Sequence, residues 1–239
     1  AGQTCSEVLI KATRDCSKAF IQALREFGQN EQCNVVLEDA RGKCTMLHCH
    51  GEINVATASD LTLAPTPNDF VQVNDDVNRA MVHQALDWLQ PRAGEHIADL
   101  FCGLGNFTLP IAKSGASVVA AEGVRNMVDN ARQHASEQGI HNVDWQVADL
   151  NDEKQLNAVL KNSVDKVLLD PSREGAYQGC QFLAQSDIRK ILYVSCNPST
   201  FTRDLKTLLD GGYQVSKIGL LEMFPYTRHL EVMALLHKP

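Results

Sequence analysis

The chain has 239 residues, of which 44% are hydrophobic and 21% are charged, and this is enough for one large globular domain or for one domain with a small companion. The longest apolar runs, such as residues 116–121, are far shorter than the roughly 20 residues that a membrane span needs, and no leader precedes a cleavage site, so we expect a cytoplasmic protein without membrane contact. The formal net charge of −7 argues against an extended nucleic-acid surface, although not against a small nucleic-acid pocket.

Cysteine usage favours reduced thiols over disulfides or a metal site. The eight cysteines are scattered through a large chain without a secretory signal, and no CxxC pair occurs. Cys44 and Cys49, with the neighbouring His48 and His50, match metal-ligand spacings poorly, so we expect no metal in this chain. Because the sequence begins with Ala1 and runs directly into helix-like residues, we expect a fragment of a longer polypeptide.

The N-terminal residues predict a small α/β appendage. Residues 6–28 carry apolar side chains at three- and four-residue spacing, which predicts a helix. Residues 34–39 and 44–49 alternate in the manner of two strands joined by a turn. This appendage is expected to occupy residues 1–67 and the remaining domain residues 68–239.

A proline-containing connector and an amphipathic helix lead into the second domain. Residues 64–70 contain two prolines and predict the connector, and residues 75–90 predict the helix, which Pro91 and Gly94 end. After that, strand-like and helix-like segments alternate, which predicts right-handed βαβ units and a doubly wound, largely parallel sheet. The expected strands are residues 96–101, 117–122, 143–148, 164–170 and 190–196, and the expected helices begin near Asn106 and cover residues 124–139, 151–161, 176–186 and 199–212.

The end of the chain departs from this alternation. Residues 214–224 and 229–237 predict two strands joined too closely to be parallel. A seven-stranded, mostly parallel sheet with an antiparallel last strand is typical of the Rossmann-like, class I methyltransferases that use S-adenosylmethionine (SAM). We therefore expect that α/β fold.

The first strand of this sheet runs into a glycine turn suited to a nucleotide. Gly103 and Gly105 allow unusual backbone angles and close approach of a ligand. Glu122 ends the second strand, where an acidic residue meets ribose hydroxyls in such folds, and Asp149 follows the third. Thr108 replaces the third glycine of a dinucleotide fingerprint, and this favours SAM over a dinucleotide.

Two further strands deliver groups for chemistry to the same edge. The fourth ends at Asp170 and the fifth at Cys196. Asp170-Pro171 is similar to a motif of amino-group methyltransferases, but no aromatic ring follows, so an exocyclic amine is a poor target. Arg173 has three candidate partners: a phosphate, a base carbonyl or a structural carboxylate.

The surroundings of Cys196 favour a thiolate. Pro198 suits the first turn of a helix, Ser199 or Thr200 can satisfy exposed amides, and the helix dipole is expected to lower the thiol pKa. A thiolate can add to C6 of uracil, which makes C5 nucleophilic towards a sulfonium methyl group, and a base must then remove the C5 proton. Glu231 on the last strand is the candidate base, because apolar neighbours would raise its pKa.

Four segments together resemble the RNA uracil-5 methyltransferases: DLFCGLGNFTLPIA, LLDPSREG, YVSCNPSTFTRDL and FPYTRHLE. The likeness is strongest to the branch that acts on bacterial 23S rRNA (RumA type) rather than the tRNA branch (TrmA type), and it covers about residues 70–239. In that family the cysteine of SCNP is the nucleophile and the glutamate of FPxTxHxE is the base. The resemblance therefore assigns these roles to Cys196 and Glu231.

The resemblance also implies cofactor contacts and a position for the target base. Phe70 is expected to lie against that base. The chain departs from the family at Ser172, where a second proline is common, and at Arg228 beside His229. The positions that match the family's SAM contacts are Gln72, Phe101, Asn106, Glu122, Asp149 and Asp170.

Members of the RumA type have an RNA-binding β-barrel and a four-iron cluster ahead of the catalytic domain. None of the eight cysteines has the clustered spacing of such ligands, so we expect the iron-sulfur cluster and the barrel in a segment outside this chain. The resemblance implies 23S rRNA as substrate, SAM as cofactor and a monomeric protein.

Three alternatives remain open at this point. The substrate could be a tRNA uridine. It could also be an RNA cytidine, although enzymes of that type generally carry Pro-Cys where Ser195 precedes Cys196 here. A methyltransferase-like module that binds RNA without catalysis is the third, and retention of both Cys196 and Glu231 argues against it.

Overall fold

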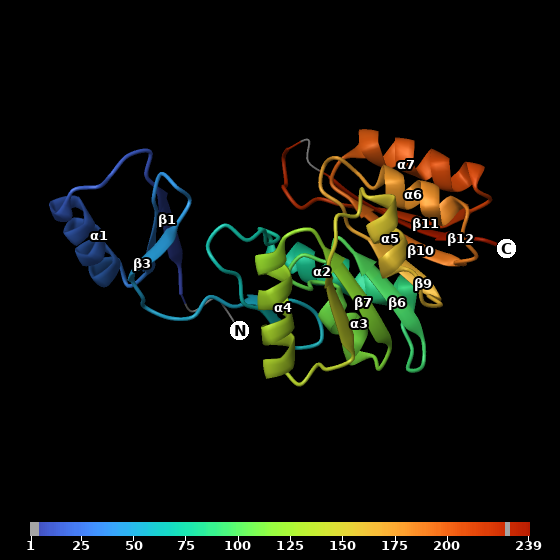
Figure 1. The fold of residues 1–239 in the computed structure, drawn as a ribbon, viewed down its shortest axis with the longest axis horizontal. Coiled ribbons are helices and arrows are strands. Elements are labelled where there is room, and N and C mark those ends of the chain that lie inside the picture. The colour runs from blue at the N-terminus through green and yellow to red at the C-terminus, as the bar shows by residue number, and fades with distance from the viewer. Residues whose placement is uncertain (1–4, 228–229) are drawn as a thin grey trace. The chain divides into compact units, whose positions relative to one another are not determined.

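The computed structural model describes residues 5–227 and 230–239 (Figure 1). Arg228, where the chain departs from the family, and the neighbouring His229 lie outside these residues. The chain divides into two compact units: a smaller unit, within Ala1–Val55 and Ala64–Val71, and a larger unit, made of Ala56–Leu63 and Gln72–Pro239. The larger unit carries the strands on which the candidate site is built.

The smaller unit is a three-stranded sheet with one helix. Strands β1 (Glu7–Lys11) and β2 (Asn34–Glu38) are parallel, and β3 (Cys44–His48) pairs with β2 in antiparallel fashion. Helix α1 (Lys18–Glu31) begins at the N-cap Ser17. The helix predicted over residues 6–28 is therefore wrong in its first part, because the apolar side chains of β1 pair with β2, a partner distant in sequence.

Gly28 lets α1 lie close to this sheet. A Cβ atom at Gly28 would lie 2.8 Å from Cβ of His48 and 2.8 Å from Cγ2 of Val35. Both neighbours are strand residues, so neither can move away easily. The glycine that looks like a helix end in the sequence is thus inside the helix, where it permits the contact.

The larger unit contains a seven-stranded sheet in the order β11-β12-β10-β9-β6-β7-β8. All neighbours are parallel except β12, which lies between β10 and β11 and is antiparallel to both. The structure confirms the predicted Rossmann-like sheet with an antiparallel last strand. The strands are β6 (His96–Leu100), β7 (Ser117–Glu122), β8 (Val143–Val147), β9 (Lys166–Leu169), β10 (Lys190–Ser195), β11 (Gln214–Leu221) and β12 (Glu231–His237).

Helices cover both faces of this sheet (Figure 1). One face packs against α2 (Asp75–Leu89), α3 (Thr108–Lys113) and α4 (Arg125–Glu137), and the other against α5 (Glu153–Val159), α6 (Tyr177–Ala184) and α7 (Pro198–Asp210). Strand residues such as Ile97, Leu168 and Tyr193 are fully buried between these layers. Burial on both faces explains why these strands read as continuous apolar runs in the sequence.

A short ribbon, all of whose residues except Val55 belong to the larger unit, was not predicted. Strands β4 (Val55–Ala56) and β5 (Thr62–Leu63) pair with each other. Two amide hydrogen bonds join β5 to α4, because the Thr62 N–H donates to Oε1 of Gln138 and Nε2 of Gln138 donates to the Thr62 carbonyl, both at 2.9 Å. No helix of the described part of the chain is long and apolar enough to cross a membrane.

Candidate functional site

The candidate site lies along one edge of the large sheet, which we call the carboxyl rim. It comprises the residues that follow β6 to β10 and the first residue of β12. Ser195 pairs with Val232 across β10 and β12, so Cys196 and Glu231, each one residue nearer the rim, lie opposite one another. The antiparallel direction of β12 is what places Glu231 at this edge rather than at the other one.

The turn after β6 is built for close approach of a ligand. Phe101 adopts a left-handed conformation with φ of +66°, which is uncommon for a bulky residue, and its N–H donates to the Ala121 carbonyl at 2.9 Å. Gly105 has φ of +91°, and a Cβ there would lie 2.9 Å from the Trp145 ring. Glycine is thus required at position 105 for both backbone and packing reasons.

Glu122, at the end of β7, is oriented by this turn. Its Oε2 accepts a hydrogen bond from the Gly103 N–H at 3.3 Å, and its Oε1 accepts from the N–H groups of Gly123 at 2.8 Å and Val124 at 3.1 Å. A carboxylate held beside a glycine turn suits the hydroxyl pair of a nucleoside. The residues present therefore fit the nucleoside part of a cofactor such as SAM.

Asn106 is held by an amide pair with Asn78 from α2. Each side chain donates to the other, at 2.8 and 3.0 Å, and Asn78 is 1% exposed. The Asn106 carbonyl also accepts a hydrogen bond from the Thr57 hydroxyl at 2.8 Å. Each amide retains one donor and one acceptor position beyond the pair, so Asn106 keeps capacity for a ligand.

Asp99 lies in strand β6, just before the glycine turn, and sequence reasoning missed it. Its side chain is fully buried, Oδ2 accepts a hydrogen bond from the Thr108 hydroxyl, and Oδ1 has no hydrogen-bond partner. Burial raises the pKa of Asp99 to about 7, and the charge of Glu122 adds to this effect. The sequence did offer a signal for this residue, because a carboxylate inside the otherwise apolar strand HIADL is unusual.

Two other predicted cofactor contacts, Asp149 and Gln72, lie farther along the chain from the glycine turn. Asp149 is exposed beyond β8, and its Oδ1 accepts from the Asn151 N–H at 2.9 Å. The Ala148 N–H donates to the Glu122 carbonyl at 3.0 Å, which brings Asp149 to the same edge as Glu122. Gln72 begins the main part of the larger unit ahead of α2. Its contact with SAM stays a prediction.

Phe70 belongs to the smaller unit and is 69% exposed. Its contact with the target base also stays a prediction.

Three acidic or thiol groups influence one another at the centre of the rim. Burial raises the pKa of the Cys196 thiol, and the Glu231 and Asp170 carboxylates add to the rise, while Arg173 opposes it. The expectation of a lowered thiol pKa was therefore wrong for the protein alone, because the sequence does not show that two carboxylates would lie beside the sulfur. Burial raises the pKa of Glu231, as predicted.

Asp170 follows β9 beside this pair. Burial raises its pKa well above the usual value, with further contributions from the charges of Glu231 and Asp99. A bound cofactor that carries positive charge would favour the ionised forms of these carboxyl groups.

The helix after Cys196 is capped and tied to the neighbouring loop. The side chain of Asn197 accepts from the Ser199 N–H at 3.0 Å and so caps α7, a role that the sequence assigned to Ser199 or Thr200. Nδ2 of Asn197 donates to the Arg173 carbonyl at 2.9 Å. This bond fixes the loop that carries Asp170 against the start of α7.

Two features away from the rim can be compared with it, a possible metal cluster and a pocket. Among residues 5–227 and 230–239, no cluster of three or more metal-ligating side chains occurs. A pocket of about 440 Å³ lies at the opposite edge of the sheet, where β6, β7 and β8 begin, and it includes His96, Ser117 and Asn142. Strand ends at that edge carry none of the predicted site residues.

Known proteins of one family resemble this chain. The family model described as tRNA (Uracil-5-)-methyltransferase matches residues 14–239. A curated relative from Alteromonas naphthalenivorans, named 23S rRNA (uracil(1939)-C(5))-methyltransferase RlmD, is 53% identical over 98% of this chain and 50% of its own length. A relative of the same name from Shewanella halifaxensis (strain HAW-EB4) is 44% identical over 95% of this chain and 52% of its own.

Two solved structures with a similar fold are also methyltransferases. The Pyrococcus abyssi tRNA (uracil-54, C5)-methyltransferase, in complex with S-adenosyl-L-homocysteine, is similar with a TM-score of 0.76 and 26% identity, covering 96% of this chain and 56% of that one. Magnesium protoporphyrin IX methyltransferase from Synechocystis PCC 6803, with 19% identity over 74% of this chain and 90% of that one and a TM-score of 0.56, is similar in fold.

The chain spans about half the length of the curated relatives that it matches. The family model nevertheless extends over both the glycine turn after β6 and the strands that carry Cys196 and Glu231. The resemblance indicated by the four sequence segments is thus confirmed, and this chain belongs to the tRNA (uracil-5-)-methyltransferase family.

Proposed function

We propose that the chain is the catalytic part of an enzyme that methylates C5 of a uridine in 23S rRNA with SAM. The observation that carries this proposal is the position of Cys196 opposite Glu231 on the carboxyl rim, the same rim that carries the glycine turn after β6 and the oriented Glu122 carboxylate. The names of the curated relatives support 23S rRNA, and in particular uracil 1939, as the substrate.

The cofactor is proposed to be held by six residues along the rim. Its nucleoside would meet the turn after β6 and the Glu122 carboxylate, and its methionine part would meet Asp170. When bound, SAM supplies an electrophilic methyl group on a positively charged sulfur. The proposed contacts are Gln72, Phe101, Asn106, Glu122, Asp149 and Asp170.

Cys196 and Glu231 divide the remaining chemistry between them. The Cys196 thiolate forms a bond to C6 of uracil, and the electron pair of the C5–C6 double bond moves towards the C4 carbonyl. C5 then gains the methyl group and still holds its proton. Glu231 takes that proton, the C5–C6 double bond forms again, and the C6–S bond breaks to return the thiolate.

Both roles can be tested on the products and on trapped protein. Unmodified 23S rRNA transcript is incubated with the protein and SAM, and the nucleosides are identified by mass spectrometry. We expect 5-methyluridine with the wild type, none with Cys196→Ala, and an accumulated covalent protein-RNA species with Glu231→Gln. Cys49→Ala, which removes an exposed thiol elsewhere, is the matched control and should retain activity.

The same assay separates the alternatives. Normal turnover by the Glu231→Gln protein, without a slow-migrating species, would show that another group is the base. Formation of 5-methylcytidine would identify the RNA cytosine-5 reaction. Preferential methylation of tRNA over 23S transcript would identify the tRNA branch of the family. A wild type that binds SAM and RNA without forming product would be a binding module.

The family resemblance also supports proposals about the whole protein. We propose that residues 68–239 form the catalytic domain and that residues 1–67 are a small α/β appendage, part of the family's central domain. The iron-sulfur cluster and the RNA-binding barrel are proposed to lie in a part of the protein outside this chain. The enzyme is further proposed to act as a monomer in the cytoplasm.

A further inference from the structure

The loop between β11 and β12 lies on the carboxyl rim. Leu221, the last residue of β11, pairs with Glu231, the first residue of β12, so β11 ends beside the proposed base and residues 222–227 continue from that point. Tyr226 is five residues from Glu231, and five extended residues span at most about 17 Å. Tyr226 therefore lies within about 17 Å of the proposed base Glu231.

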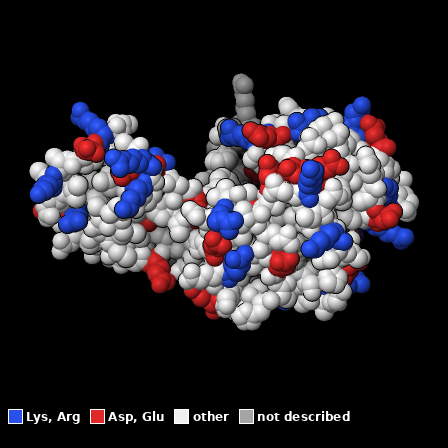
Figure 2. Space-filling view, viewed as in Figure 1, with Lys and Arg blue, Asp and Glu red and all other residues white. Residues whose placement is uncertain are grey.

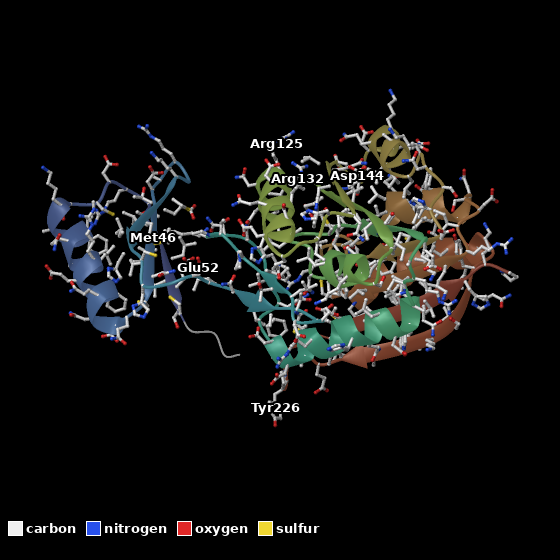
Figure 3. All side chains as sticks on the ribbon, turned by 90° about the horizontal axis from the view of Figure 1, so that it is seen from below. Met46, Glu52, Arg125, Arg132, Asp144 and Tyr226 are labelled. Carbon is white, nitrogen blue, oxygen red and sulfur yellow. The ribbon has the colours of Figure 1, made fainter. Side chains whose placement is uncertain are left out.

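Tyr226 is the most exposed of the large apolar and aromatic side chains that the structure describes. Its relative exposure is 106%, compared with 41% for Phe224 in the same loop. Figure 3 shows its ring projecting away from the rest of the molecule. An aromatic ring in this position gains nothing from burial in the protein.

The backbone at Tyr226 is also in an unfavourable conformation. Its φ is +65°, in the left-handed region that bulky side chains rarely adopt. The turn around it is fixed by Thr227, whose N–H and hydroxyl both donate to the Phe224 carbonyl, at 3.2 and 2.8 Å. A residue that is strained and unburied in a defined turn points to a ligand rather than to a role in folding.

We propose that Tyr226 stacks on a nucleobase next to the target uridine in the RNA strand, an inference that rests on the proposed function. An enzyme that acts on a base must take that base out of the stack, which leaves the face of a neighbouring base uncovered. An exposed aromatic side chain covers such a face without regard to which base it is. Tyr226 is therefore a binding residue for the RNA, distinct from the groups that perform the chemistry.

Three variants separate the ring from the backbone and from simple apolar character. Tyr226→Phe keeps the aromatic ring, Tyr226→Leu keeps a large apolar side chain without one, and Tyr226→Asn relieves the left-handed backbone because Asn adopts it readily. The affinity of the protein, saturated with S-adenosylhomocysteine, is measured for a 23S rRNA fragment around uracil 1939. We expect Leu and Asn to weaken binding about tenfold and Phe to bind like the wild type.

Abasic substitutions identify the stacked base. Each nucleotide flanking the uridine is replaced in turn by an abasic site, and affinity is measured for the wild type and for Tyr226→Leu. At one flanking position the two losses should not add, because the ring and the base form one interaction. SAM affinity should be the same in all variants, which a general loss of structure would not permit.

The outcomes distinguish this inference from the proposed function. Methylation of the fragment by the wild type tests the function alone. If methylation proceeds and both proteins respond equally to every abasic substitution, or if the Asn variant binds as well as the wild type, the stacking role is wrong. If the full-length protein, with the proposed RNA-binding barrel present, neither binds nor methylates the fragment, both proposals fail.

Discussion

Charged groups of both signs act on the sulfur of Cys196, and together with burial they set the pKa of the thiol. Burial and the carboxylates of Glu231 and Asp170 raise the thiol pKa, and the Arg173 guanidinium works in the opposite direction. A raised pKa means that less thiolate is present at any pH below it. The lowered thiol pKa that the sequence suggested from the helix dipole of α7 is therefore not what the protein without ligands shows.

We predict that two substitutions move the titration of Cys196 in opposite directions. Glu231→Gln removes a negative charge and should lower the thiol pKa, so alkylation by iodoacetamide becomes fast at a lower pH. Arg173→Ala removes a positive charge and should shift the profile to higher pH. The rate of modification of the Cys196 peptide is followed by mass spectrometry across a pH series. Identical profiles for the two variants would show that these charges do not act on the sulfur.

At the scale of elements, α7 is anchored by a buried carboxylate. Asp204 is fully buried and accepts hydrogen bonds from the Tyr193 hydroxyl at 2.7 Å, the Ala176 N–H at 2.6 Å and Nε of Arg203 at 2.7 Å. These donors come from β10, from the segment before α6 and from α7 itself. The anchor therefore keeps the start of α7, and with it Cys196, in register with the loop after Asp170.

We predict that Asp204→Ala lowers the free energy of unfolding by about 2–4 kcal/mol, because two buried donors lose their acceptor. The matched control is Asp210→Ala on the same helix. Asp210 pairs with Lys206 at 3.8 Å with both side chains largely exposed, so its loss should change stability by less than about 1 kcal/mol. Urea unfolding of both variants provides the measurement. Equal effects would mean that the buried network does not anchor the helix.

Elements with local signals could be predicted, and those that depend on distant partners could not. The strands from β6 to β10 are apolar runs that alternate with helices, and residue-level patterning was sufficient to predict that each of them exists. Strand β1 has the same spacing as a helix and becomes a strand only by pairing with β2. Likewise the sequence shows Asn78 only as a polar residue of a helix. Its hydrogen bond with Asn106 depends on how α2 packs, which the sequence does not show.

The candidate site shows the same division. Cys196 and Glu231 are recognisable from short motifs, because each stands next to a strand boundary. The buried state of Asp99 and the left-handed turn at Tyr226 follow from packing and backbone geometry, which no residue pattern displays. The raised pKa of Cys196 required knowledge of which carboxylates come together in space.

For the whole molecule, charge limits how this chain can hold RNA. The formal net charge is −7, and Figure 2 shows basic and acidic side chains interspersed on the visible surface of each unit. RNA affinity that depends on neutralised phosphates falls steeply with salt, in proportion to the number of contacts. A chain of this charge offers few such contacts, so its recognition of RNA must depend more on stacking and on the reacting site.

We predict that RNA binding by this chain depends only weakly on salt. With about two phosphate contacts and a slope of about −0.7 per contact for single-stranded RNA, affinity should fall roughly sevenfold between 50 and 200 mM salt.

The exposed Arg173, close enough to Cys196 to influence the pKa of its thiol, is expected to supply one of these contacts. Arg173→Ala should therefore make the slope shallower by about 0.7. Fluorescence anisotropy of a labelled 23S rRNA fragment at several salt concentrations gives both slopes. A loss of a thousandfold over this range would reveal an extended basic surface, and an unchanged slope in the variant would assign Arg173 to a base carbonyl or to the protein itself.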